Sequence, residues 1–195
     1  MLKILKRNKL LIILITLTII FFILGIFFNS IIDNDIKKNI SLNIKDIFLN
    51  LKNSSNNWHN FFTCLFTNVI FITLIWFLGI SIFGGFISLG LYLYKVFICG
   101  FEVVSLLVNF KLNRIIQVFF YILPNIVNLF IYFIVCFFSI SYSLILFKYI
   151  FFKEDINIRF IMKKYFKILI LSFIFIFLNA IIDVFIISRV LLLFF

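Results

Sequence analysis

The chain has 195 residues, of which 65% are hydrophobic and 32 are phenylalanine, and its mean hydropathy is +1.27. This composition leaves too little polar surface to cover a soluble particle and therefore excludes a sizeable water-soluble domain. The formal net charge is +11, but the basic residues stand at the ends of apolar runs, where Lys and Arg anchor membrane helices, so nucleic-acid binding is not expected. The composition predicts an all-α, polytopic membrane bundle of about five transmembrane helices in one domain.

The first predicted span covers residues 10–28, a charge-free run that follows a basic tail at residues 1–9. Signal peptides also combine a basic start with an apolar run, but this run is long and no small-residue cleavage site follows it. We therefore expect a retained signal-anchor helix with its tail in the cytoplasm.

Residues 29–60 form the one extended polar stretch, which we expect outside the cytoplasm. Apolar residues recur in it at helical spacing: Ile40, Ile44, Ile47, Phe48 and Leu51. This spacing predicts a short amphipathic helix on the membrane or against partner helices. Trp58 and His59 follow at the start of the next span, where aromatic side chains suit the headgroup level. His59 has no patterned carboxylate or Cys beside it, which favours an interfacial role over catalysis or metal binding.

The second predicted span, residues 62–80, is followed by a glycine-rich break. Five of the six glycines fall between Gly79 and Gly100. Ser81 with Gly85, and Gly84 with Ser88, have the small-x-x-x-small spacing of closely packed membrane helices. A tight turn between two spans explains the same glycines equally well.

The third apolar segment, residues 86–108, contains Lys95 and Glu102, seven residues apart and so on one helical face. An unpaired charge at mid-bilayer costs at least about 2.5 kcal/mol. Two explanations compete: the pair neutralises itself or a neighbour within the bundle, or the segment bends or re-enters at Gly90 and Gly100 so that its charges meet water. A proton or ion relay is a third reading, although one Lys and one Glu do not make a chain of relay groups.

A short polar segment, residues 109–114, precedes an apolar run at residues 115–150 that is too long for one span. Pro124 and Asn125 lie in the first third of this run. Proline removes a backbone donor and clashes with the preceding turn, so we expect a half-helix at 115–123 and a fourth span at 126–147. Broken helices at membrane depth are tolerated only when they are buried or line a cavity, which predicts an interior packing site here.

Residues 148–167 carry six basic and two acidic side chains and are predicted to form a cytoplasmic loop. The last span, 168–187, holds Asn179 and Asp183 one turn apart on one face. Five crossings from a cytoplasmic amino terminus place the carboxyl terminus outside the cell membrane.

Signals of chemistry are missing from the sequence. Cys64, Cys99 and Cys136 are isolated in apolar runs, without the spacing of a disulfide framework or a metal site. No paired aspartates, nucleotide motif or metalloprotease pattern is present. We therefore expect no enzyme activity, no cofactor and no metal.

The middle of the chain resembles the stage II sporulation protein M family. From Leu65 to Gly84 the sequence L-F-T-N-V-I-F-I-T-L-I-W-F-L-G-I-S-I-F-G is similar to the family's Asn followed by an apolar helix that ends in W-x-L-G-I-S-x-x-G. The matching positions in this stretch are Asn68, Trp76, Gly79, Ser81 and Gly84. Further matches lie at Lys95, Gly100, Phe101, Asn109, Leu123, Pro124, Asn125 and the S-Y-S-L stretch at 141–144. The span that ends near Gly25 and the acidic position at Asp183 fit more loosely.

The chain departs from the family at three places. Val96 stands where a glycine usually follows the lysine, Gly85 replaces a usual proline, and the external segment is short. The change at Val96 puts close backbone packing there in question, although Gly100 is retained.

The resemblance implies a membrane protein that acts during engulfment of the forespore and holds two peptidoglycan-degrading enzymes, stage II sporulation proteins D and P, at the mother-cell membrane. Membrane lipids and further copies of the chain are the other expected partners. The first hypothesis is thus a non-enzymatic scaffold that locates and activates wall hydrolases. The alternative is a subunit of a transporter or channel with a polar path through Lys95 and Glu102.

Overall fold

The computed structural model describes residues 2–32, 57–109, 115–153 and 157–187 of the chain. Within these ranges the backbone is almost entirely helical, and five helices are long and apolar enough to cross a membrane. They are α1 (Leu2–Ile31), α3 (Asn57–Gly79), α4 (Gly84–Asn109), α5 (Ile115–Phe152) and α6 (Ile158–Ile181), which continues into a π-helical segment, η2 (Ile182–Ile187). The predicted all-α, five-span bundle is confirmed.

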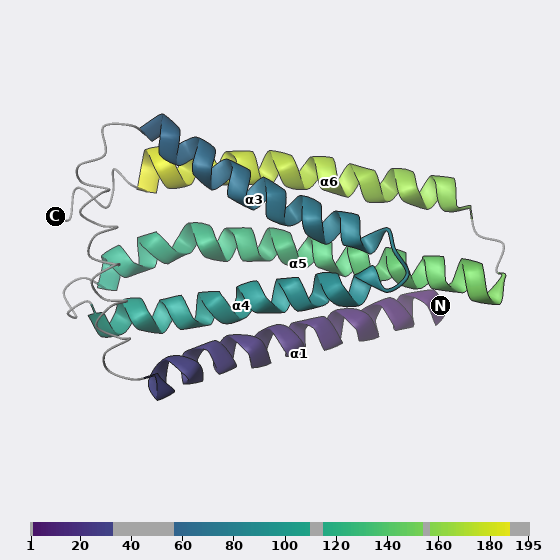
Figure 1. The fold of residues 1–195 in the computed structure, drawn as a ribbon, viewed down its shortest axis with the longest axis horizontal. Coiled ribbons are helices and arrows are strands. Elements are labelled where there is room, and N and C mark those ends of the chain that lie inside the picture. The colour runs from purple at the N-terminus through teal and green to yellow at the C-terminus, as the bar shows by residue number, and fades with distance from the viewer. Residues whose placement is uncertain (1, 33–56, 110–114, 154–156, 188–195) are drawn as a thin grey trace.

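The helices lie along one long axis, and successive helices run in opposite directions (Figure 1). α4 lies between α1 and α5, whereas α3 packs against α5 and α6 on the other side of the bundle. α1 therefore rests mainly on α4 and is the most peripheral helix. At one end of the bundle α1 begins, α3 turns into α4, and α5 turns into α6.

The main core is apolar and receives side chains from all five helices. Fully buried members of this cluster are Ile72, Ile75, Val135, Cys136 and Ile176. Val96, which replaces the family's glycine, is also buried, with 1% of its surface exposed. Many phenylalanine side chains, such as Phe66, Phe77 and Phe130, are exposed on the outer surface of the bundle, as expected for a protein surrounded by lipid.

Glycines bring α1 and α4 into close contact. A Cβ at Gly25 would lie 3.0 Å from the backbone nitrogen of Phe101 and closer still to the carbonyl of Phe97. A Cβ at Gly100 would overlap the carbonyl of Phe22. Glycine is therefore required at both positions for the approach of two helix backbones.

The glycine-rich break is both a turn and a packing site, so the two interpretations of the sequence hold together. Ile80 donates its N–H to the carbonyl of Phe77 at 3.1 Å, which closes the turn after α3. One turn later, a Cβ at Gly85 would lie 2.8 Å from the Cβ of Ser143 on α5. The small residues thus shorten the connection and let α4 approach α5.

The helix carrying Pro124 is continuous, and the predicted half-helix at 115–123 is wrong. α5 runs for 38 residues through the proline. Pro124 is fully buried among neighbouring helices, and the side chain of Asn179 on α6 donates to its carbonyl oxygen at 3.0 Å. This bond ties α6 to α5 at the proline turn, whereas the carbonyl that the proline leaves without its helical donor is that of Phe120, four residues earlier. Proline is tolerated at membrane depth in a helix that is packed among others.

Two further boundaries differ from the prediction. α4 is one helix of 26 residues, so the segment neither breaks nor re-enters at Gly90 or Gly100. Residues 148–152 and 158–167 are helical, so the predicted basic loop is reduced to a short connection. The reason is the length of α5: at 1.5 Å per residue its 38 residues extend about 57 Å, which is longer than a hydrocarbon core of about 30 Å. The lysine-bearing end of α5 therefore reaches water while it is still helical. The predicted amphipathic helix lies outside the described residues.

The short connection between α5 and α6 has clear local signals. Lys153 takes a positive φ of 49° immediately after α5 and so ends that helix in the left-handed conformation. Asn157 then caps α6, because its side-chain oxygen accepts the N–H of Phe160 at 3.1 Å.

Candidate functional site

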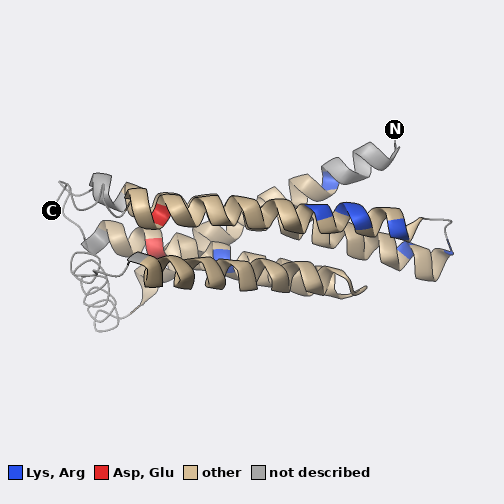
Figure 2. Cartoon of the chain, turned by 90° about the horizontal axis from the view of Figure 1, so that it is seen from above, with Lys and Arg blue, Asp and Glu red and all other residues tan. Residues whose placement is uncertain are grey.

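Charge is distributed unequally along the bundle. Seven described cations lie toward the end where α5 turns into α6, which we call the basic end: Lys9, Lys148, Lys153, Arg159, Lys163, Lys164 and Lys167. In the described part of the chain the only acidic residues are Glu102 and Asp183, and both lie in the opposite half, as Figure 2 shows. We call this opposite half, from the level of Lys95 to the far helix ends, the polar half.

The polar half contains a cavity between α3, α4 and α5, with a volume of about 90 Å³. Its polar lining consists of Asn68, Lys95, Glu102, Asn125, Asn128 and Tyr132. A cavity of this size and polarity has room for a few water molecules, each with several hydrogen-bonding partners. Four of the residues that the sequence singled out, Asn68, Lys95, Glu102 and Asn125, therefore meet at one site.

Lys95 and Glu102 line the same cavity two turns apart on α4. No direct ion pair joins them in the described structure. The Lys95 ammonium instead lies 5.2 Å from the centre of the Phe71 ring on α3, in cation–π contact. Of the two explanations for these charges, a break or re-entry of the segment is excluded, and neutralisation of the pair stays a prediction, because the two groups share a polar cavity without touching.

Asn68 connects the cavity to the end of the last span. The hydroxyl of Tyr132 on α5 donates to the side-chain oxygen of Asn68 on α3. The Asn68 amide in turn lies 3.4 Å from the sulfur of Cys64, whose thiol donates to Asp183 at 3.5 Å. Buried and half-buried polar groups of three helices are thereby linked in one chain of hydrogen bonds.

A second set of bonds joins α5 to α6 behind the cavity. The Asn179 amide donates to the Asn128 side-chain oxygen and to the Pro124 carbonyl, each at 3.0 Å. Both asparagines are buried, with 5% of their surface exposed. An unpaired amide here would lose water without any replacement, so each partner depends on the other.

Asp183 stands in the π-helical segment that ends the last span. Such segments are rare, often occur at functional sites and shift the helical register of the residues that follow. Asn179 and Asp183 were predicted to share one helix face, but they bond to different helices. Asn179 bonds to Asn128 on α5, whereas Asp183 accepts from Cys64 on α3.

Five other predicted residues are not among those that line the cavity. Trp76 holds α3 against α6 by a reciprocal pair of bonds, in which its indole N–H donates to the Tyr165 carbonyl at 3.2 Å and the Tyr165 hydroxyl donates to the Trp76 carbonyl at 2.7 Å. Gly79 packs against Ser139 and the same tyrosine. Gly84 opens α4 at the turn and Gly100 faces α1, so these positions build the bundle rather than the polar site. Asn109, also predicted, is the last residue of α4.

Sequence reasoning missed some members of the polar network. Asn128 and Tyr132 follow Asn125 at three- and four-residue steps on one face of α5, a spacing that was visible but was not used. Asn29 was also missed; it is buried, and its amide bonds to the hydroxyl of Ser105 and, at 3.4 Å, to the carbonyl of Phe101 on α4. A single polar residue at the end of an apolar run gives no hint of its partner.

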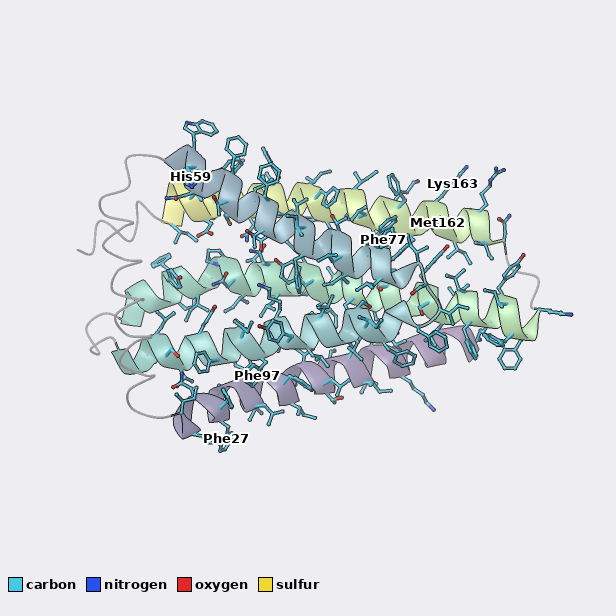
Figure 3. The ribbon with its side chains drawn as sticks, in the orientation of Figure 1. Phe27, His59, Phe77, Phe97, Met162 and Lys163 are labelled. Atoms are coloured by element: carbon cyan, nitrogen blue, oxygen red, sulfur yellow. The ribbon has the colours of Figure 1, made fainter. Side chains whose placement is uncertain are left out.

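His59 lies exposed in the first turn of α3, at the far end of the polar half (Figure 3). Within the described ranges, no three His, Cys, Asp or Glu side chains come together as they would around a metal ion. The polar site consists of amides, a tyrosine hydroxyl, one lysine and one carboxyl group, which can bind water, ions or polar partners.

The chain matches the model of the family described as stage II sporulation protein M over residues 13–187. It belongs to the stage II sporulation protein M family. The match includes α3 to α6, most of α1 and every residue of the cavity. No curated protein and no solved structure matches the chain. The resemblance noted at Asn68, Trp76 and Pro124 is thus confirmed as family membership.

Proposed function

We propose that the chain is a non-enzymatic membrane scaffold of the sporulation engulfment machinery, which locates and activates peptidoglycan hydrolases at the mother-cell membrane. The observation that carries this proposal is the family match over residues 13–187. The expected partners are stage II sporulation proteins D and P, as the family resemblance implies.

The proposed orientation places the basic end in the cytoplasm and the polar half toward the cell wall. Ten of the eighteen Lys and Arg residues belong to the basic end, either in the tail before residue 10 or between residues 148 and 167. An excess of cations marks the cytoplasmic side of a membrane protein. Wall hydrolases act outside the membrane, so this orientation turns the polar half toward them.

The geometry supports a scaffold because the polar groups of the bundle join helices to one another. Asn179 links α6 to α5, and the chain from Tyr132 through Asn68 and Cys64 reaches Asp183. These bonds fix the positions of the helix ends in the polar half, where a partner outside the membrane would dock. A rigid platform lowers the entropy that a partner loses on binding.

Retrieval of partners tests the proposal. A tagged copy is extracted gently from cells at the engulfment stage, and the accompanying proteins are identified by mass spectrometry. The expected result is enrichment of a wall hydrolase relative to an unrelated five-span protein with the same tag. If the tagged chain enriches no wall hydrolase above the control protein at any stage of engulfment, the scaffold proposal fails.

A second candidate, a transporter or channel subunit, is favoured by one observation: two opposite charges line a polar cavity without pairing. Such residues within a membrane commonly mark ion or substrate paths. Lys95→Met and Glu102→Gln are made singly and together. Restoration of sporulation by the double variant indicates a structural pair and weakens this candidate, whereas persistent loss in a normally folded double variant favours a path.

A further inference from the structure

An apolar groove opens between α1, α4 and α5 at the basic end, with a volume of about 360 Å³. It exists because α1 rests on α4 and barely touches α5 there, so side chains of all three helices stay uncovered. Phe86 of α4 is 69% exposed and Leu144 of α5 is 41% exposed. In a membrane such a groove is filled by a lipid chain or by another protein.

One lysine lines this groove, and helical spacing places a second beside it. Lys9 of α1 belongs to its lining. Lys148 lies one turn beyond Leu144, on the face of α5 that lines the groove. Lys9 begins the apolar span of α1 and Lys148 lies one turn before the end of α5, so both are at the depth where lysine side chains reach lipid headgroups.

A second groove of the same volume, about 360 Å³, lies between α3 and α6 and provides an internal comparison. Its lining is wholly apolar and includes Leu65, Val69, Phe173 and Phe177. The two grooves are thus alike in size and apolar character and differ in charge at the rim. Any preference of the first groove for an anionic ligand is therefore attributable to its lysines.

We propose that the groove between α1 and α5 is a binding site for an anionic phospholipid, with one acyl chain along Ile13 and Leu17 and the phosphate between Lys9 and Lys148. Basic pockets between membrane helices bind anionic headgroups in this way, because the ammonium groups meet the phosphate at a surface of reduced dielectric. A zwitterionic lipid gains less, since its own cation opposes the two lysines. This site would hold the peripheral helix α1 against α5, which it otherwise hardly touches.

Photoactivatable lipids test the site on the full-length protein in nanodiscs. Phosphatidylglycerol and phosphatidylcholine probes carry the same diazirine-labelled acyl chain, and labelled peptides are mapped by mass spectrometry. We expect phosphatidylglycerol to label the groove between α1 and α5 roughly twentyfold more than phosphatidylcholine does, from about fivefold per lysine, and the two probes to label the α3–α6 groove equally. Equal labelling of the first groove by both probes in the unmodified protein would overturn the proposal without any variant.

Substitutions then assign the preference to the two lysines. Lys9→Ala and Lys148→Ala should each reduce phosphatidylglycerol labelling by roughly fivefold, and the double variant should reduce it to the level of phosphatidylcholine. Lys163→Ala is the matched control, since Lys163 projects from α6 at the same end of the bundle but away from the groove (Figure 3). A preference that survives the double substitution, or that Lys163→Ala reduces equally, contradicts the site. These results do not depend on retrieval of a hydrolase, so the lipid site and the scaffold proposal can fail separately.

Discussion

The two halves of the bundle satisfy their interior polar groups in different ways. Toward the basic end, small hydroxyls bond across tightly packed helices, as when Ser139 on α5 meets the Ile75 carbonyl at 3.1 Å and the Ser88 hydroxyl at 2.9 Å. In the polar half, amides and charges from Asn68 to Glu102 surround a cavity. The difference teaches that interior polar groups near the basic end are satisfied by direct bonds between packed helices, whereas the polar half keeps charged and amide groups around a polar cavity.

The largest expected effect tests which half of the bundle faces the outside of the cell, and labelling at each position should be all-or-none. In a variant without the three native cysteines, a cysteine at Asn113 should react with an impermeant maleimide added to intact cells, because the described end of α4, Asn109, belongs to the polar half and the proposed orientation places that half outside. A cysteine at Lys153, in the connection at the basic end, should react only after the cells are opened. Reaction of Lys153→Cys from outside would invert the proposed orientation.

Close packing toward the basic end should be the most sensitive to added volume. Gly85→Leu should destabilise the protein by about 3 kcal/mol, because its Cβ would lie 2.8 Å from that of Ser143. Gly90→Leu is the matched control on the same helix, since a Cβ there meets no atom within 4 Å. Thermal unfolding in detergent measures both, and equal stability of the two variants would contradict the assigned packing.

The amide network of the polar half should contribute less than the glycine contacts. Asn179→Leu and Asn128→Leu should each cost about 1 kcal/mol, since bonds between membrane helices have modest net values. The double variant should lose less than the sum of the single losses, because the two amides bond at 3.0 Å. Strictly additive losses in unfolding experiments would show that the amides do not act together.

The smallest expected effect is the contact of Lys95 with the Phe71 ring. Phe71→Leu should lower stability by about 0.5–1 kcal/mol beyond its loss of packing, because the ammonium lies 5.2 Å from the ring centre. In a Lys95→Met background this additional loss should vanish. A double-mutant cycle by thermal unfolding isolates the term, and zero coupling would mean that Lys95 is held by the cavity alone.

The sequence alone was sufficient for the five spans and for four of the six polar residues that line the cavity. Hydropathy works well in membranes because each helix must present a long apolar run to lipid. Lys95, Glu102 and Asn68 stood out as polar groups in such runs, and they do line one cavity. These residues stood out because a polar group is costly to bury in an apolar run, and the same cost favours their meeting at one polar cavity.

The errors share a different cause, since they depend on contacts between residues far apart in the chain. Pro124 predicts a break when it is considered alone, but it lies fully buried inside a continuous helix, and Asn179, 55 positions later, packs and bonds at the same turn. Tyr132 was inconspicuous among the aromatics of an apolar run until its hydroxyl met Asn68. Local patterns do not specify which distant polar group will satisfy a buried one.

The central claim is that wall hydrolases meet this protein at the polar half, and photo-crosslinking at opposite ends of the bundle tests it most directly. p-Benzoylphenylalanine replaces Trp58 in the first turn of α3 or Phe83 in the turn at the other end, positions that are 62% and 70% exposed. In engulfing cells, the probe at Trp58 should capture a peptidoglycan hydrolase and the probe at Phe83 should not. Capture from Phe83 alone, or equal capture from both positions, would contradict the account.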